Sequence, residues 1–508
     1  MTGGLAFAAI ASPRLHAGGV RSQDTQFSTT PFTLGVASGD PTPDGVVLWT
    51  RLAPEPLTGG GMAPADMEVT WEVARDEGMR DVIKRGRALA AARWAHSVHV
   101  EVDGLAPGQW YWYQFTAGGH ASALGRTRTL PLPGAAVDRL RFAFASCQNY
   151  EHGYFTAHRH MAGEDLDLVV HLGDYIYETA GSDRFVRRHV GTETKTLADY
   201  RNRYAQYKTD RDLQAAHAAL PWVVTWDDHE VVNDYAGDRP KSNDPPEVFL
   251  QRRAAAYQAY YEHMPLRRSS LPRGPFMKIY RNFSYGALAS FFVLDTRQYR
   301  TVQACGNGLR PACDMEQRHL DPKGTLMGAE QEQWLFDLLR RSRAPWNLLS
   351  QQVMMAKIDW WPGSDERYSY DRWDGYEVER NRLLAFLSAR RVANPVVLAG
   401  DVHNNWVCDL KMDFAERNSP TVATEFVGTS ISTTGDGGEV IKDGEAVVAK
   451  NPCVKFHNDR RGYVSCEITP KAMRADYRVL DYVTREGAPL RTTATFKIDD
   501  GKPGAIRV

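Results

Sequence analysis

The sequence lacks three features, each of which would define a class of protein. None of its apolar runs approaches the roughly 18–20 residues of a membrane-spanning helix, which excludes an integral membrane protein. Positively and negatively charged side chains are balanced, with Lys+Arg 61 against Asp+Glu 62. Because the chain has no excess of positive charge to bind a phosphate backbone, general nucleic-acid binding is not expected. Gly 42 and Pro 27 in 508 residues are too few for a fibrous or disordered chain. These absences favour a soluble multidomain protein, and at this length an enzyme.

Cysteine is also scarce, with six residues in the chain. Cys305 and Cys313 bracket the loop CGNGLRPAC, a spacing that suits a local disulfide in an oxidising compartment. The stretch GGLAFAAIA at residues 3–11 is typical of the apolar part of an export signal whose basic start is missing. Residues 1–31 are therefore interpreted as a signal remnant or a flexible N-terminus. We expect an exported protein, either secreted or periplasmic.

Residues 32–130 have the pattern of an all-β domain. Gly45 to Arg51 and Met67 to Ala74 are rich in β-branched and aromatic residues, and the second alternates apolar with polar positions. In Gly104 to Phe115, a Pro-Gly turn leads into a run of aromatics, as in fibronectin type III domains. The sequence predicts a small β-sandwich here, followed by a Pro/Gly linker at 131–134.

From residue 138 to 508 the pattern changes to that of a layered α/β domain. Short apolar runs that end in polar residues alternate with helical patterns. The runs are 140–145, 166–172, 222–226, 291–294 and 396–399, and the clearest helical patterns are 196–207 and 328–340. In such sheets the chemistry gathers at the carboxyl ends of the strands.

Four of these five strand ends carry side chains that can bind a metal. They are Cys147, Asp174 with Tyr177, Asp228 with His229, and Asp401 with His403. One strand-terminal aspartate can simply cap the next helix, but a thiol, a phenol, carboxylates and imidazoles on converging strand ends favour a metal site. Gly173 lets the chain turn before Asp174, whose carboxylate could bridge two cations about 3.5–4 Å apart.

Five motifs, in the order SCQNY, GDYIYE, WDDHE, DTRQYR and GDVHNN, resemble those of the PhoD-type alkaline phosphatases, also called phospholipase D-like metallophosphatases. The likeness extends from Phe32 over nearly the whole chain and includes SQQVMMAK and WDGYEVER. The family belongs to the calcineurin-like and purple acid phosphatase superfamily. The resemblance therefore implies an α/β fold with a four-layer αββα metallophosphatase domain after the small β-sandwich. Twin-arginine export is usual in the family, although no arginine pair stands in this N-terminal stretch.

The resemblance implies a first metal site made by Cys147, Asp174, Tyr177 and His403. Cys147 stands where most relatives have a metal-binding aspartate, and Tyr177 matches the phenolate of ferric purple phosphatases. His403 keeps the last histidine of the GHxH motif. This charge-rich set of ligands favours Fe³⁺.

A second metal site would share the bridging Asp174 and add Asp228 and Asp401. Asp228 replaces the asparagine of the usual GNHE motif, and Asp401 replaces the first histidine of GHxH. Carboxylate oxygens favour a hard divalent cation, Ca²⁺ above all, with Mg²⁺ and Mn²⁺ as alternatives. His229 keeps the catalytic histidine, and we expect it to serve the leaving oxygen while a metal-bound hydroxide attacks phosphorus in line.

Four further residues have roles that the motifs leave more open. Asn233 is a candidate for a metal or phosphate contact, and Arg297 is either a phosphate contact or part of a structural ion pair. Gln352 occupies a position where it could replace a family histidine that has no clear match here. His171 is expected to be a buried strand residue rather than a ligand.

The expected activity is hydrolysis of phosphomonoesters, phosphodiesters or both, on a small phosphoester substrate. A phospholipase D-type activity on lipid head groups is the main alternative, and a non-catalytic binding protein on the same scaffold is a remote one. The sequence does not separate these, because substrate choice depends on loops around the cleft. The loops expected to matter are 182–196, 238–247 and 301–323. The oligomeric state cannot be predicted.

Overall fold

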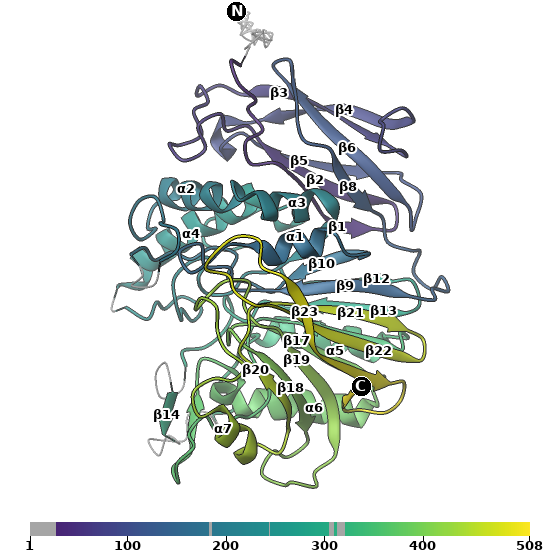
Figure 1. Cartoon of the computed structure of the whole chain (residues 1–508), viewed down its shortest axis with the longest axis vertical. Helices are drawn as coiled ribbons and strands as arrows, with labels where there is room; N and C mark the ends of the chain where they lie inside the picture. Colours follow the sequence, from purple (N-terminus) through teal and green to yellow (C-terminus); the bar gives the residue numbers. More distant parts are fainter. Residues whose placement is uncertain (1–26, 182–184, 243, 304–308, 312–320) are drawn as a thin grey trace, which may run out of the picture.

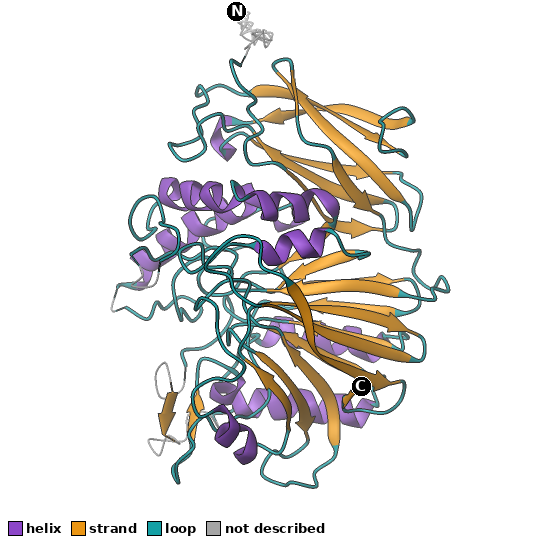
Figure 2. Ribbon diagram, viewed as in Figure 1, coloured by secondary structure: helices purple, strands orange, loops and turns teal. Residues whose placement is uncertain are grey.

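The computed structural model describes residues 27–181, 185–242, 244–303, 309–311 and 321–508. Two β-sheets pack face to face, and helices cover the outer side of each sheet (Figures 1 and 2). The predicted four-layer αββα arrangement is confirmed. The predicted export signal at residues 3–11 and the predicted Cys305–Cys313 disulfide lie outside the described residues.

The first sheet has the strand order β24-β23-β22-β21-β9-β10-β11-β1-β2-β5. Strands β9, β10 and β11 run parallel, so their carboxyl ends meet at one edge. The bounds are β1 (Val36–Thr42), β2 (Gly45–Arg51), β5 (Ser97–Asp103), β9 (Leu140–Ala145), β10 (Leu168–His171), β11 (Pro221–Val224), β21 (Gly462–Thr469), β22 (Ala472–Leu480), β23 (Leu490–Asp499) and β24 (Ile506–Arg507).

The second sheet has the order β12-β13-β15-β17-β19-β18-β20, and its central strands β13, β15, β17 and β19 are parallel. The bounds are β12 (Arg281–Tyr285), β13 (Ala289–Val293), β15 (Trp346–Ser350), β17 (Pro395–Ala399), β18 (Asn405–Lys411), β19 (Thr421–Val427) and β20 (Val454–Asn458). The main core lies between the two sheets. There Phe142 of β9 packs edge to face on Phe291 of β13, with the ring centroids 5.3 Å apart.

Helices form the two outer layers. The first sheet is covered by α1 (Thr156–Ala162), α2 (Leu197–Lys208), α3 (Arg211–Ala219) and α4 (Pro246–His263), and the second by α5 (Ala329–Arg341), α6 (Glu377–Arg390) and α7 (Gly444–Lys450). A capping box between Thr196 and Asp199 starts α2, close to the predicted boundary. None of the helices in the described ranges has the length and apolar character that crossing a bilayer requires.

The N-terminal β region is joined to the first sheet. A second small sheet is formed by β3 (Met67–Ala74), β4 (Val82–Ala90), β6 (Trp110–Ala117), β7 (His120–Ala121) and β8 (Gly125–Arg128). It packs on β1, β2 and β5 around a separate hydrophobic core. Because β1 pairs in parallel with β11, with Ser38 opposite Pro221, one layer of this sandwich continues directly into the large sheet.

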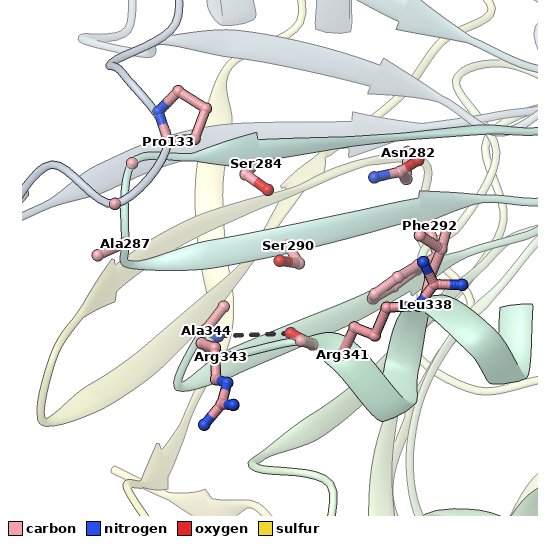
Figure 3. Close-up of a pocket in the computed structure, with 13 residues that line it drawn as sticks. Pro133, Asn282, Ser284, Ala287, Ser290, Phe292, Leu338, Arg341, Arg343 and Ala344 are labelled. Atoms are coloured by element: carbon pink, nitrogen blue, oxygen red, sulfur yellow. Dashed lines mark hydrogen bonds between the residues drawn. The ribbon is translucent and has the colours of Figure 1, made fainter.

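Shorter elements complete the chain. The strands β14 (Leu309–Pro311) and β16 (Arg367–Ser369) pair with each other, and 3₁₀ turns lie at 92–94, 268–270 and 373–376. A pocket of about 280 Å³ lies between the linker at Pro133, the β12–β13 hairpin with Ser284 and Ser290, and Ala344 just before β15 (Figure 3). This pocket is at the amino ends of the parallel strands, away from their carboxyl ends.

Candidate metal centre and active site

The predicted ligands follow β9, β10, β11 and β17, whose carboxyl ends lie among the loops gathered at one end of the sheets (Figure 2). Cys147, Asp174, Asp401 and His403 have positive φ angles of 59°, 55°, 65° and 63°. Non-glycine residues in this conformation cost about 1–3 kcal/mol each and gather at functional sites. Gly173 has φ 116°, and a side chain there would collide with the backbone nitrogen of Asp227. The sharp turn before Asp174 therefore requires glycine.

Cys147, Asp174, Tyr177 and His403 form one group, which we call the first cluster. Ligand atoms of Cys147, Asp174 and His403 lie within 4.8 Å of one another. The Tyr177 hydroxyl donates to Asp174 Oδ2 at 2.9 Å and lies 3.2 Å from His403 Nε2. Thr433 supports the cluster, with its Oγ1 2.9 Å from the Tyr177 hydroxyl and 2.7 Å from the Cys147 carbonyl oxygen.

The first cluster is poor in positive charge. Burial raises the pKa of Cys147, Asp174 and Tyr177 well above their usual values, and the Asp174 charge raises those of Cys147 and Tyr177 further. Asp174 Oδ1 is buried without a hydrogen-bond partner, and no lysine or arginine of the described ranges forms an ion pair with Asp174. A bound cation would supply the missing charge and a partner for this oxygen. The donor set therefore fits a metal ion.

Asp174 also belongs to a second group, with Asp228 and His229, whose ligand atoms again lie within 4.8 Å. The His229 ring lies over Tyr177 with ring centroids 4.1 Å apart, and its Nδ1 is 2.6 Å from Glu178 Oε2. Burial alone would lower the pKa of His229, but the charges of Glu178, Asp174 and Asp228 raise it well above its usual value. Asp174 thus belongs to two groups of potential ligands.

A third group is neutralised by the protein itself. Asp228, Asp234 and Asp371 also lie close enough to share a cation. Arg297, whose side chain is 0% exposed, forms ion pairs with Asp227 and with Asp371 at 2.8 Å. Arg300 binds Asp371 at 2.9 Å, and Lys241 binds Asp234 at 2.6 Å. We call Asp227, Asp228, Asp371, Arg297 and Arg300 the arginine network. Arg297 therefore lies among protein carboxylates in this network.

Four other residues singled out in the sequence lie outside these groups. Asp401 is outside the three sets of ligands and accepts a hydrogen bond from Arg372 Nε at 2.7 Å. The backbone N–H of Asn233 donates to Glu178 at 2.8 Å, and its side chain is partly exposed. Gln352 is buried, and its amide bonds Thr225, Leu294 and Thr296, all of the scaffold. His171 is a buried residue of β10, as predicted.

Two glutamates that hold the site were not among the predicted site residues. Glu230 accepts hydrogen bonds from the backbone N–H groups of Asp174, Tyr175 and Asp227 at 3.0, 2.6 and 2.8 Å, and burial raises its pKa to about 8. Glu178 orients His229, as described above. Glu230 ends the motif WDDHE and Glu178 ends GDYIYE. Both residues could therefore have been found in the motifs, but their hydrogen-bond partners could not be predicted from the sequence.

Two family models match the chain, the PhoD-like phosphatase over residues 142–477 and its N-terminal domain over residues 19–131. This chain belongs to the PhoD-like phosphatase family. It is 53% identical over 487 residues to alkaline phosphatase D of Bacillus subtilis (strain 168), covering 95% of this chain and 83% of that relative. The predicted resemblance is therefore confirmed, and this PhoD-like phosphatase is a phosphoester hydrolase.

Solved structures agree with this membership. The structure of PhoD superposes with a TM-score of 0.93 at 53% identity and covers 95% of this chain and 93% of that chain. The purple acid phosphatase PPD1 from yellow lupin (Lupinus luteus) superposes with a TM-score of 0.55 at 14% identity, covering 91% and 74%. The second match shows that the fold is shared.

Proposed function

We propose that this phosphoester hydrolase is an exported alkaline phosphatase that works with two metal ions. The observation that carries the proposal is that Asp174 belongs to the first cluster and also lies within 4.8 Å of Asp228. A carboxylate between two sets of ligands is the arrangement that two-metal hydrolases use. The membership in the PhoD-like phosphatase family supports it.

The donor types support different metals on the two sides of Asp174. The first cluster, with thiol, phenol, carboxylate and imidazole, would hold Fe³⁺. Asp174 and Asp228, together with the nearby Asp401, would hold a hard divalent cation, with Ca²⁺ favoured over Mg²⁺ and Mn²⁺. When bound, such a pair of cations polarises the phosphoryl group and activates water for in-line attack.

The chain's own contribution centres on His229. Its Nδ1 lies 2.6 Å from the buried Glu178 carboxylate, and the neighbouring carboxylates raise the pKa of His229 well above its usual value, so the ring would carry a proton on Nε2 as well as on Nδ1. The ring also packs on Tyr177, with the two ring planes inclined at 30°. In this orientation His229 would donate a proton or hydrogen bond to the leaving oxygen. Glu230 would fix the positions of Asp174 and Asp227 during this step, because it accepts hydrogen bonds from both backbone N–H groups.

The substrate is proposed to be a small phosphoester, either a monoester or a diester. Purified protein should be assayed with p-nitrophenyl phosphate, bis-p-nitrophenyl phosphate and phosphatidylcholine, before and after chelation. We expect turnover of the first or second compound that falls on chelation and returns with added metal. Faster turnover of phosphatidylcholine would replace the proposal with a phospholipase D-type activity, and unchanged turnover after complete metal removal would contradict the two-metal mechanism.

A further inference from the structure

Arg372 differs from the other arginines around the candidate site because its side chain reaches solvent. The side chains of Arg297, Arg300 and Arg461 are 0%, 0% and 2% exposed, and each is paired with a carboxylate of the protein. The side chain of Arg372 is 19% exposed, and that of its partner Asp401 is 17% exposed. Among these four guanidinium groups, Arg372 is the one that an incoming substrate can contact.

The guanidinium of Arg372 is held in one orientation. Its Nε donates to Asp401 Oδ2 at 2.7 Å, and its central carbon lies 4.9 Å from the ring centroid of Trp360. The preceding residue, Asp371, is fixed by Arg297 at 2.8 Å and by further buried bonds. A long side chain that is anchored at its base, along one edge and on one face loses little entropy on binding a ligand.

This guanidinium lies beside the first cluster. Asp401, which accepts the hydrogen bond from Arg372, is two residues before His403, and both have positive φ angles, 65° and 63°.

We propose that Arg372 binds the non-bridging oxygens of the substrate's phosphoryl group, an inference that rests on the active site proposed above. Nε is the one guanidinium nitrogen of Arg372 with a hydrogen bond to a described residue. The edge formed by the two terminal nitrogens carries parallel N–H donors, which match two phosphoryl oxygens in a bidentate contact. Arg297 cannot serve in this way, because buried carboxylates surround it.

This contact would favour phosphomonoesters over diesters. A monoester offers three non-bridging oxygens and up to two negative charges, whereas a diester offers two such oxygens and one charge. A bidentate guanidinium contact is therefore stronger with the monoester. Inorganic phosphate, the product of monoester hydrolysis, should use the same contact.

The test compares the metal-loaded parent with Arg372→Ala and Arg372→Lys. Loss of a charge-assisted hydrogen-bond pair should raise the KM for p-nitrophenyl phosphate and the inhibition constant of inorganic phosphate by about 10–100-fold. The KM for bis-p-nitrophenyl phosphate should rise less. Arg372→Lys, which keeps the charge without the planar fork, should lie between the parent and Arg372→Ala. The metal content should stay at the parent's level in both variants.

Arg367→Ala is the matched control. Arg367 stacks on Trp361 at 3.9 Å, much as Arg372 lies over Trp360, but it forms no ion pair with a residue of the candidate site. In Arg367→Ala, the KM for p-nitrophenyl phosphate and the inhibition constant of inorganic phosphate should equal those of the parent. A thermal melt of each variant identifies any protein that fails to fold, and the Arg372→Lys comparison then carries the test.

An unchanged inhibition constant for phosphate in metal-replete Arg372→Ala would overturn the inference. Loss of metal together with a lower kcat and an unchanged KM would also overturn it, because Arg372 would then act only by holding Asp401. In either case an active parent leaves the proposed phosphatase function in place. If the parent fails to hydrolyse p-nitrophenyl phosphate, the proposed function fails, and calorimetric titration with inorganic phosphate still compares Arg372→Ala with the parent.

Discussion

The first cluster has one carboxylate, Asp174, and the arginine network has three, yet only the network contains its own positively charged partners. In the arginine network, Arg297 and Arg300 stand between the carboxylates and bond them at distances such as 2.8 and 2.9 Å. In the first cluster, Asp174 has no ion pair with a described lysine or arginine, and one of its buried oxygens has no hydrogen bond. The two regions meet in the second group of ligands. There Asp228, which belongs to the network, lies close to Asp174 of the first cluster.

This difference indicates that the arginine network has a structural role and the first cluster a chemical one. A buried ion-pair network that carries its own cations is complete after folding and fixes the loops that cross it. A buried set of donors without a cation is incomplete until an ion binds. We therefore expect changes in the first cluster to act mainly on metal content and turnover, and changes in the arginine network to act mainly on stability.

The largest effect is expected from Asp174→Asn. Both proposed cations would lose a ligand, so turnover should fall by about 10³-fold or more. Metal content per folded protein should fall with it, as measured by elemental analysis. Asp337→Asn, a change at an exposed carboxylate of α5, serves as the control and should change neither quantity. Parent-level metal and turnover in Asp174→Asn would remove Asp174 from the centre.

His229→Ala should affect chemistry without emptying the site. Its loss should lower kcat by about 10²–10⁴-fold, the usual range for acid–base catalysis, while the ligands of the first cluster remain. Glu178→Gln keeps a hydrogen-bond acceptor beside His229 Nδ1 but removes the charge, so a smaller fall is expected. Near-normal turnover in metal-replete His229→Ala would rule out its role at the leaving group.

Arg297→Met should chiefly reduce stability. Removing one partner from a buried ion-pair network leaves carboxylates uncompensated and costs about 3–5 kcal/mol of the free energy of unfolding. Urea unfolding measures this change. Arg340→Met is the matched control, because Arg340 pairs with Asp337 at the surface with 43% of its side chain exposed, and such pairs contribute only about 0–1 kcal/mol. Equal losses in both variants would contradict the role given to the network.

A smaller effect concerns the support beneath the first cluster. His158 Nε2 lies 2.7 Å from Gln148, the residue after Cys147, and burial lowers the pKa of His158 from 6.5 to about 3. Between about pH 6.5 and pH 3, His158 therefore binds a proton in the unfolded chain but not in the folded chain. Stability should be fully present above pH 6.5 and fall towards pH 4, by up to about 1.4 kcal/mol per pH unit for this histidine. His158→Gln should flatten the slope, and an unchanged slope would count against this assignment.

Much of the fold follows from local patterns in the sequence. The predicted strands 45–51, 67–74 and 140–145 have the same bounds in the structure, because alternation and β-branched residues mark them clearly. The pairing of β1 with β11 was not predictable, because it joins residues about 180 positions apart, as in Ser38 and Pro221. One layer of the predicted N-terminal sandwich is therefore part of the large sheet.

The site shows the same limit. Cys147 and Asp174 follow parallel strands of the first sheet and His403 follows a parallel strand of the second, so their position at the carboxyl ends of strands could be predicted. The pairing of Arg372 with Asp401 could not, because it joins two loops through side chains alone. The burial of Arg297 among acidic partners from two separate segments, 227–228 and 371, could not be predicted from a motif either.

The most direct test of the central claim is metal analysis combined with visible absorption spectroscopy of the pure, active protein. We predict iron together with a hard divalent ion, for which the ligand type favours calcium. A visible charge-transfer band from the Tyr177 phenolate and the Cys147 thiolate should shift or fade in Tyr177→Phe and Cys147→Ser, and mild chelation should remove the divalent ion first. Colourless, fully active protein with zinc at both positions would contradict the ferric assignment. Fully active protein without any bound metal would contradict the whole account of the first cluster.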